Sequence, residues 1–217
     1  MFMEIILQML RKSGHRRLYF IMLLSFIALL AGCARPQPSN IDNICSMFRQ
    51  YPDWYWATKD TERRWKMPPY VQMAIIHQES SFKAKAQPER TKILWVIPWT
   101  RPSTSYGYSQ ALASTWQEYQ KAGGGSRASR SNFADTVDFI GWYGRQANRR
   151  AGIATDDAYS LYLAYHEGVG GFMRKTYRNK QWLISVAKRV GSRSKRYQTQ
   201  LAQCEKSLTK KPWYRFW

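Results

Sequence analysis

Apolar side chains recur at helical spacing along most of this chain, and prolines or glycines separate one such stretch from the next. Recurrence every three to four residues places side chains on one face of a helix, whereas a strand requires strict alternation. Between residues 87 and 105, three prolines interrupt an aromatic and β-branched run, which favours a loop or a short strand pair. We therefore expect an all-α fold, with α+β character at most through a short hairpin. The pattern predicts helices at residues 41–51, 54–65, 69–82, 110–120, 132–144, 155–165 and 182–204.

The N-terminal residues 1–32 have the character of an export signal. Basic residues precede an apolar run at residues 18–31, which is shorter than the roughly 20 residues that a membrane-spanning helix needs. The run ends in Leu-Ala-Gly before Cys33, which resembles the lipobox of bacterial lipoproteins. The resemblance implies that Cys33 is lipidated and anchors the chain to a membrane, and Ala34 in place of aspartate favours the outer one. An ordinary signal peptide cut nearby and an uncleaved anchor are the alternatives.

The rest of the chain is long enough for one domain with a hydrophobic core. We expect a short tether at residues 33–40 that bears prolines, a single domain at residues 41–206, and a basic, aromatic tail at residues 207–217. The pattern does not decide whether this tail lines a groove, docks a partner or touches lipid.

The chain carries a formal net charge of +20, and a field of that sign attracts polyanions. Export would make cell-wall glycan, its carboxylated stem peptides and lipid head groups the partners at hand, so we expect no nucleic acid. Aromatic residues form 15% of the chain. They either build the core or stack against the apolar faces of sugars.

Three cysteines in an exported protein would leave one thiol unpaired. If Cys33 carries lipid, Cys45 and Cys204 remain, and they bracket nearly the whole domain. An oxidising compartment would let them form a disulfide. The alternative is two free, buried thiols.

Glu79 is a carboxylate on an otherwise apolar helix face. It follows Ile75 by four residues and Val71 by eight, so the helix that buries those side chains turns Glu79 toward the core or a cleft. Burial and the negative helix C-terminus both disfavour the charged form and raise its pKa. A carboxylic acid that keeps its proton near neutral pH can protonate a poor leaving group such as a glycosidic oxygen. The alternative is a frayed last turn in which Glu79 faces water.

Three segments follow in order along the chain: Gln-Glu-Ser-Ser-Phe at 78–82, Tyr-Gly-Tyr-Ser-Gln at 106–110 and Leu-Ala-Tyr-His-Glu-Gly at 163–168. Together they resemble the lysozyme-like lytic transglycosylases of the SLT type, whose fingerprint is Glu-Ser-x-Phe, Gly-Leu-Met-Gln and Ala-Tyr-Asn-Ala-Gly. The resemblance covers residues 69–204. The chain departs from it at Tyr108 and Ser109, and again at His166 and Glu167, which suggests a lipoprotein subfamily.

The resemblance implies a lysozyme-like domain that cleaves the β-1,4 bond between N-acetylmuramic acid and N-acetylglucosamine in peptidoglycan, without water and without a cofactor. Glu79 would act first as acid and then as base, which yields 1,6-anhydromuramic ends. The site residues that it implies around Glu79 are Ser80 at the helix end, Ser109 and Gln110 at the substrate, Tyr165 as an orienting or core residue, and His166 in the substrate site.

The sequence lacks the residues that several other enzyme chemistries require. His77 and Glu79 have the His-x-Glu spacing of deaminases, but no Pro-Cys-x-x-Cys follows, and His-Glu-x-x-His is absent. With three histidines in all, we expect no metal site. Two alternatives to a transglycosylase stay open: a hydrolytic muramidase that uses Glu167 as a second carboxylate, and a non-catalytic peptidoglycan-binding lipoprotein. The identity of any envelope protein partner stays open as well.

Overall fold

A computed structural model of the chain describes residues 35–90, 92–93, 97–98 and 103–209. The chain divides into two units, Met1–Arg35 and Pro36–Trp217, and nearly all of the first unit lies outside the described residues. The predicted signal at 1–32, Cys33 and most of the predicted tail therefore lie outside them too. Within the described residues, no helix has both the length and the apolar character needed to span a bilayer.

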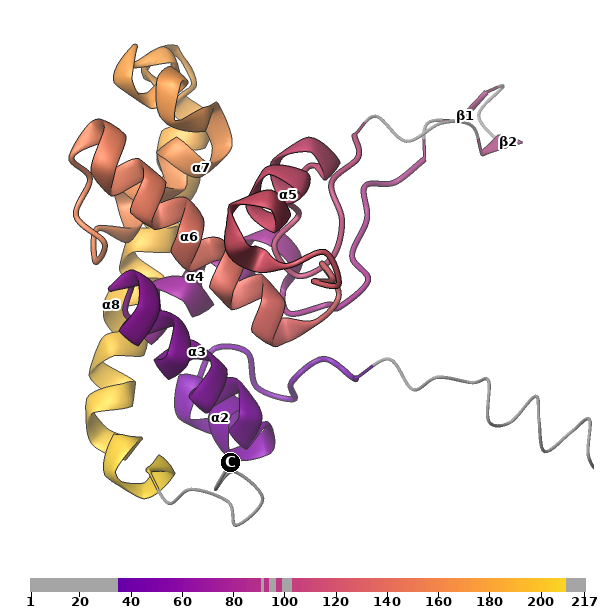
Figure 1. The fold of residues 1–217 in the computed structure, drawn as a ribbon. Coiled ribbons are helices and arrows are strands. Elements are labelled where there is room, and N and C mark those ends of the chain that lie inside the picture. The colour runs from indigo at the N-terminus through magenta and orange to yellow at the C-terminus, as the bar shows by residue number, and fades with distance from the viewer. Residues whose placement is uncertain (1–34, 91, 94–96, 99–102, 210–217) are drawn as a thin grey trace, which may run out of the picture. The chain divides into compact units, whose positions relative to one another are not determined.

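The described part of the second unit is built mainly of helices, as Figure 1 shows, and the prediction of an all-α fold is confirmed. A short antiparallel hairpin, β1 (Lys92–Ile93) with β2 (Ile97–Pro98), lies in the proline-bearing stretch. The helical elements are α2 (Ile44–Gln50), α3 (Pro52–Trp65), α4 (Pro69–Ser80), α5 (Ala113–Tyr119), the π-helical turn η1 (Gln120–Gly124), α6 (Phe133–Ala151), α7 (Ala158–Met173), the 3-10 turn η2 (Thr176–Asn179) and α8 (Gln181–Leu208).

Several helix boundaries lie a few residues from their predicted positions, and two of these differences have a local cause. The first helix begins at Ile44 rather than at 41, because the side chain of Asn43 accepts a hydrogen bond from Ser46 N and caps the helix there. α7 does not stop at Gly168. Gly168 has a φ of +74° and kinks the helix, which then continues to Met173. Glycine adopts this left-handed conformation without the steric cost that a Cβ brings, so the chain turns there without ending the helix.

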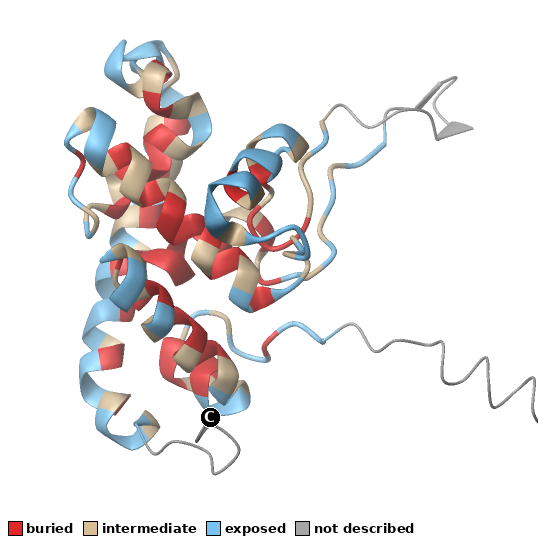
Figure 2. Ribbon diagram, viewed as in Figure 1, coloured by how far each residue is buried: buried red, intermediate tan, exposed pale blue. Residues whose placement is uncertain are grey.

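The core forms where α3, α4, α6 and α7 meet, and Figure 2 shows the buried residues on their inward sides. Trp54 of α3 is fully buried at the centre. Its ring lies parallel to Phe133 at a centroid distance of 3.9 Å and packs against Phe82 at 5.7 Å. Buried aromatic pairs of this kind contribute roughly 1 kcal/mol beyond the area that they bury. They fix the end of α4 against the start of α6.

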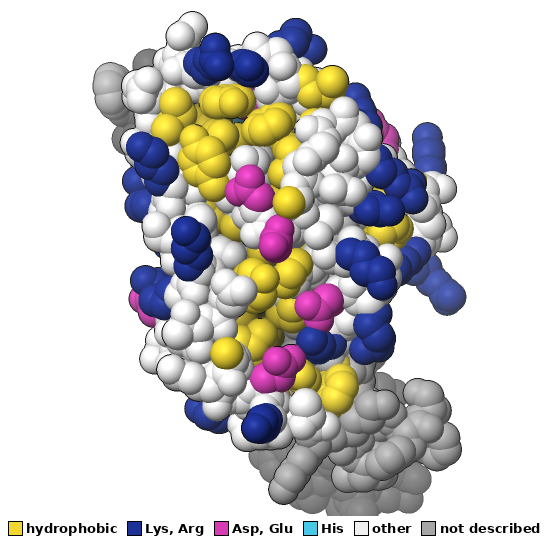
Figure 3. All heavy atoms as spheres, turned by 90° about the vertical axis from the view of Figure 1, so that its left-hand side faces the viewer, with side chains coloured by type: hydrophobic (Ala, Val, Ile, Leu, Met, Phe, Trp, Pro, Cys, Tyr) yellow, Lys and Arg dark blue, Asp and Glu magenta, His cyan; other side chains and the backbone are white. Residues whose placement is uncertain are grey.

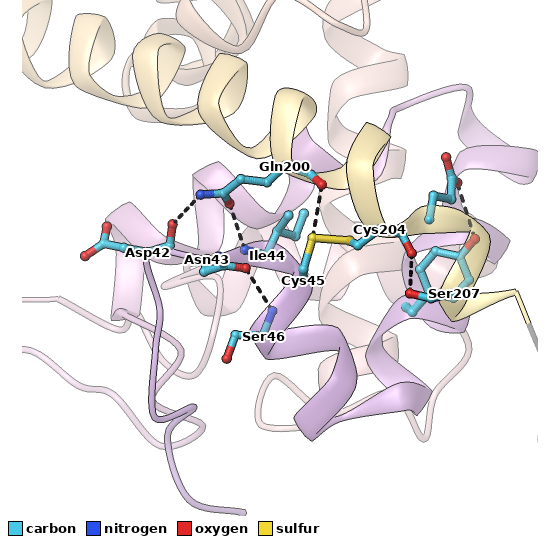
Figure 4. The surroundings of a disulfide bond; sticks show 10 residues. Asp42, Asn43, Ile44, Cys45, Ser46, Gln200, Cys204 and Ser207 are labelled. Atoms are coloured by element: carbon cyan, nitrogen blue, oxygen red, sulfur yellow. Dashed lines mark hydrogen bonds between the residues drawn. A yellow bond between two sulfur atoms is a disulfide. The ribbon is translucent and has the colours of Figure 1, made fainter.

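A disulfide between Cys45 and Cys204 joins α2 to α8, which confirms the predicted pair and excludes two free thiols. Figure 4 shows that Gln200 reinforces the same junction: its side chain accepts a hydrogen bond from Ile44 N at 3.0 Å and donates one to Asp42 O at 3.2 Å. The two ends of the domain are thereby held together by one covalent bond and two hydrogen bonds.

Candidate active site

Glu79 lies in the last turn of α4, where the helix meets the rest of the domain. Val71 and Ile75, which precede it on the same face, are almost fully buried, and Glu79 itself is partly buried. Ser81 and Phe82 both have positive φ, at 50° and 62°, so the chain turns sharply after the helix. Phe82 is fully buried and holds that turn in the core. The helix end is consequently fixed, and the carboxyl group does not lie on a frayed turn.

Burial raises the pKa of Glu79 to about 7. A hydrogen bond from the Tyr162 hydroxyl acts in the opposite direction, because it favours the carboxylate. Desolvation is the larger effect. Near neutral pH, Glu79 therefore exists in comparable amounts as acid and as carboxylate, which is the property that a group needs to give up a proton and take one back.

Tyr162 was not among the residues singled out from the sequence. The hydroxyl of Tyr165, to which an orienting role was assigned, instead donates to the carbonyl oxygen of Ser109 at 2.7 Å. Burial raises the pKa of Tyr165 well above its ordinary value, so it stays a neutral donor. Tyr162 lies three residues before Tyr165 on α7, and three-residue spacing on a helix was the one signal that could have drawn attention to it.

Glu79 opens into a cleft of about 490 Å³. The walls come from the end of α4, the segment before α5, the middle of α6 and the kinked part of α7. The lining residues are Glu79, Gln110, Ala111, Leu112, Thr115, Phe139, Tyr143, Tyr165, His166, Glu167 and Gly168. A cleft of this size suits a ligand of a few sugar units better than a macromolecular surface.

One wall of the cleft is aromatic. The rings of Tyr143 and Tyr165 meet edge to face at 5.1 Å, and Phe139 lies 6.4 Å from Tyr165. The hydroxyl of Tyr143 donates to Ala164 O at 2.8 Å, which ties α6 to α7 behind the wall. These contacts give a rigid apolar surface beside the acid, of the kind that packs against the C–H face of a pyranose.

The predicted substrate contacts divide into two groups. Gln110 and His166 line the cleft together with Glu79 and Tyr165. Ser80 and Ser109 do not line it: both are buried, and Ser80 donates back to Ile76 O at 3.3 Å. The Ser109 hydroxyl has no hydrogen-bond partner among the described residues. The backbone carbonyl oxygen of Ser109 accepts the hydrogen bond from the Tyr165 hydroxyl.

The segment that carries Gln110 is held by its own hydrogen bonds. The side-chain amide of Gln110 donates to Ala86 O at 2.9 Å and to Gly107 O at 2.8 Å. Arg130 donates from one guanidinium nitrogen to Thr104 O at 2.7 Å and Ala111 O at 2.9 Å. The cleft wall is thus preorganised by charge-assisted and amide hydrogen bonds.

Glu167 is an ion-paired residue rather than a free acid. It receives hydrogen bonds from Thr176, from His166 at 3.1 Å and from the Lys180 ammonium at 2.7 Å. The hydrogen bonds from Lys180 and Thr176 lower its pKa to about 2. Glu167 is therefore charged at all physiological pH values and holds its proton far less tightly than Glu79.

His77 lies away from the cleft. Its Nδ1 is 2.7 Å from the Tyr197 hydroxyl, which itself donates to Ile41 O, so Nδ1 carries the proton in this pair. Burial and the nearby Arg193 lower its pKa to about 4, which keeps it neutral. Across the described ranges, no three His, Cys, Asp or Glu side chains come close enough together to hold a metal ion.

Comparison with known proteins agrees with this geometry. A search of curated proteins and a search of solved structures found no match. A family model, described as the transglycosylase SLT domain, matches residues 21–204. That range takes in every segment that forms the cleft, from the end of α4 to α7. The chain therefore belongs to the transglycosylase SLT domain family.

Proposed function

We propose that the protein is a lytic transglycosylase that cleaves the β-1,4 bond between N-acetylmuramic acid and N-acetylglucosamine in peptidoglycan and leaves 1,6-anhydromuramic ends. The observation that carries the proposal is Glu79, a carboxyl group whose pKa of about 7 results from burial at a sugar-sized cleft. Family membership supports the substrate class.

In the proposed reaction, neutral Glu79 donates its proton to the bridging oxygen as the bond from that oxygen to muramoyl C1 breaks. The leaving sugar departs with a new hydroxyl. The Glu79 carboxylate then removes the proton from the C6 hydroxyl of the same muramoyl unit, whose oxygen attacks C1 and closes the anhydro ring. The proton returns to Glu79, no water is consumed, and the enzyme is ready for another cycle. Tyr162 supports the carboxylate stage through its hydrogen bond.

A hydrolytic muramidase with two carboxylates is the second candidate, and Glu167 is the carboxylate that it would need. With a pKa of about 2 and three hydrogen-bond partners, Glu167 is a weak base for activating water. This observation favours the transglycosylase.

Digestion of purified cell wall followed by mass spectrometry tests the proposal. We expect fragments lighter by one water than the hydrolytic products, since the anhydro ring replaces the reducing end. Glu79→Gln should release no fragments yet still sediment with the wall, whereas the exposed Glu89→Gln serves as the matched control and should behave as the parent. Fragments with reducing ends would favour the muramidase. Wall binding without fragments from the unmodified chain would favour a non-catalytic protein.

We also propose that the chain is exported and anchored by lipid on Cys33, with residues 33–40 as tether and 41–206 as the working domain, on the periplasmic side of the outer membrane. The lipobox-like sequence and the disulfide support export. Labelling of cells with a radioactive fatty acid should mark the parent chain and not Cys33→Ser. Equal labelling of both would contradict the anchor.

A further inference from the structure

The segment that follows the kink of α7 carries an exposed aromatic ring next to the cleft. Trp182, in the first turn of α8, has 57% of its surface exposed, the highest value among the large hydrophobic side chains that the structure describes. An exposed indole offers a large, flat apolar face for stacking, and a position next to the cleft would bring that face to a ligand bound there. Its ring contacts His166 edge to face at 5.1 Å, and His166 lines the cleft.

Trp182 is held in place by the ion pair at Glu167. Lys180, the residue before α8, donates to Glu167, as does Thr176 from η2. The Glu167 side chain is only 4% exposed, so the three elements α7, η2 and α8 converge on a nearly buried carboxylate. Lys180, Thr176 and His166 each donate a hydrogen bond to this carboxylate, so its side chain is fixed by several partners from different elements. Two residues beyond Lys180, the indole of Trp182 is thereby fixed beside the cleft.

We propose that Trp182 forms an additional sugar subsite that continues the cleft beyond His166, with the Glu167–Lys180 ion pair as its positioning brace. The proposal rests on the proposed function, because it takes the ligand to be a peptidoglycan glycan strand. The C–H face of a pyranose packs on an exposed indole, and the ring adjoins the cleft through a lining residue. In this proposal Glu167 and His166 help to position the substrate, and Glu79 carries out the proton transfers.

A lipid surface is the competing occupant. In Figure 3, hydrophobic side chains gather on the upper part of the molecule, with Lys and Arg at their border. Met173, the last residue of α7, is 56% exposed. However, the ammonium nearest to Trp182 along the chain, that of Lys180, is already paired with Glu167, and Trp182 contacts His166, which lines the cleft. These two observations favour the glycan.

The test measures binding of purified glycan strands by calorimetry, with the Glu79→Gln variant as parent so that strands stay intact. We expect Trp182→Ala to weaken strand affinity about tenfold, which corresponds to about 1.4 kcal/mol. Trp182→Phe should keep most of the affinity because it retains a stacking ring. Met173→Ala is the matched control, since it removes an equally exposed apolar side chain in the same region, and should stay within about twofold of the parent.

Lys180 variants test the brace without touching a lining residue. Lys180→Met should weaken strand affinity about threefold, whereas Lys180→Arg keeps the ion pair and should restore it. Parental affinity in Lys180→Met would overturn the brace, and parental affinity in Trp182→Ala would overturn the subsite. If Trp182→Ala lost binding to vesicles containing phosphatidylglycerol but bound glycan strands as the parent does, Trp182 would be assigned to lipid instead. A parent that binds no strands would also overturn the subsite, while release of anhydro fragments by the unmodified chain tests the cleavage separately.

Discussion

At the scale of single residues, the proposed chemistry depends on one carboxyl group, that of Glu79, whose proton affinity is set by its surroundings. Burial raises the pKa of Glu79, and the Tyr162 hydroxyl opposes part of that rise. The raised pKa keeps the acid form available at neutral pH, while the hydrogen bond favours the carboxylate that the second proton transfer of the proposed reaction needs.

The rate of wall cleavage should fall as pH rises through about 7, because in the proposed reaction bond breaking needs protonated Glu79, whose pKa is about 7. Tyr162→Phe removes the hydrogen bond that favours the carboxylate, so this fall should move to higher pH and the maximal rate should drop. Initial rates from the clearing of wall suspensions over about pH 5 to 9 measure both effects. Tyr143→Phe is the control, since the Tyr143 hydroxyl binds Ala164 O. If the pH midpoint of the fall in rate moved equally in Tyr162→Phe and Tyr143→Phe, the role assigned to Tyr162 would be contradicted.

Glu79→Gln should stabilise the fold at alkaline pH. Its folded-state pKa lies above the ordinary value of 4.5, so between about 4.5 and 7 the folded chain holds a proton that the unfolded chain has released. Stability conferred by the protonated form is therefore lost as pH rises through this window. We expect Glu79→Gln to raise the free energy of unfolding by about 2 kcal/mol at pH 8 and by little at pH 4. Urea unfolding at the two pH values measures this, and an equal difference at both would contradict it.

At the scale of elements, the cleft depends on a loop and a kinked helix as much as on regular helices. Gly107 has a φ of +78°, and a Cβ there would lie 2.0 Å from the carbonyl oxygen of Arg130. Tyr108 N donates to that same oxygen at 3.2 Å. The absence of a side chain at 107 thus lets the segment that carries Gln110 lie directly against the loop before α6.

Gly107→Ala should destabilise the protein and lower activity, because it combines backbone strain with a steric clash. The positive φ alone costs about 1–2 kcal/mol for a residue with a Cβ. Gly152 provides the matched control: its φ is +68°, yet nothing lies within 4 Å of an added Cβ. We expect Gly152→Ala to show only the strain, and Gly107→Ala to lose at least about 2 kcal/mol more. Thermal unfolding of both variants, with wall clearing as the second readout, makes the comparison. Equal losses of stability in the two variants would show that the close approach to the Arg130 carbonyl oxygen does not contribute.

At the scale of the whole molecule, the disulfide connects the beginning of the domain to its end. Cys45 and Cys204 are 159 residues apart, so the bond closes a loop that contains every element of the cleft. A cross-link over so long a loop removes more conformational freedom from the unfolded chain than a short one does. Neither cysteine of the disulfide is among the residues that line the cleft.

Replacement of both cysteines by serine should lower the free energy of unfolding by about 3–5 kcal/mol. Activity at low temperature should persist, because the cleft lies elsewhere. Guanidinium unfolding of the double variant against the parent, each with and without a reducing agent, measures the effect. Reductant should destabilise only the parent. The same response in both proteins would contradict a stabilising disulfide.

Local pattern in the sequence was sufficient for the helices and for the face that carries Glu79, and the count of cysteines was sufficient for the disulfide. A helix is specified by residues within a few positions of one another, so Val71, Ile75 and Glu79 could be placed on one face without knowledge of the rest. The family could also be predicted, since its three segments keep their order along the chain. The kink at Gly168 could not be told from a helix end, because glycine is compatible with both.

Only the tertiary structure decided which side chains surround Glu79 and which stay beneath the cleft. The Tyr165 hydroxyl donates a hydrogen bond to Ser109 O, 56 residues away in the chain, while the Tyr162 hydroxyl donates one to Glu79. The two tyrosines nevertheless lie on the same turn of α7. Ser80 and Ser109 are buried, and Glu167 is bound by Lys180. Hydrogen-bond partners, desolvation and pKa values depend on which distant segments converge in space, and the spacing of residues along a chain carries no such information. The sequence by itself determined the helices and the helix face that carries Glu79, and packing decided the pKa of that carboxyl group.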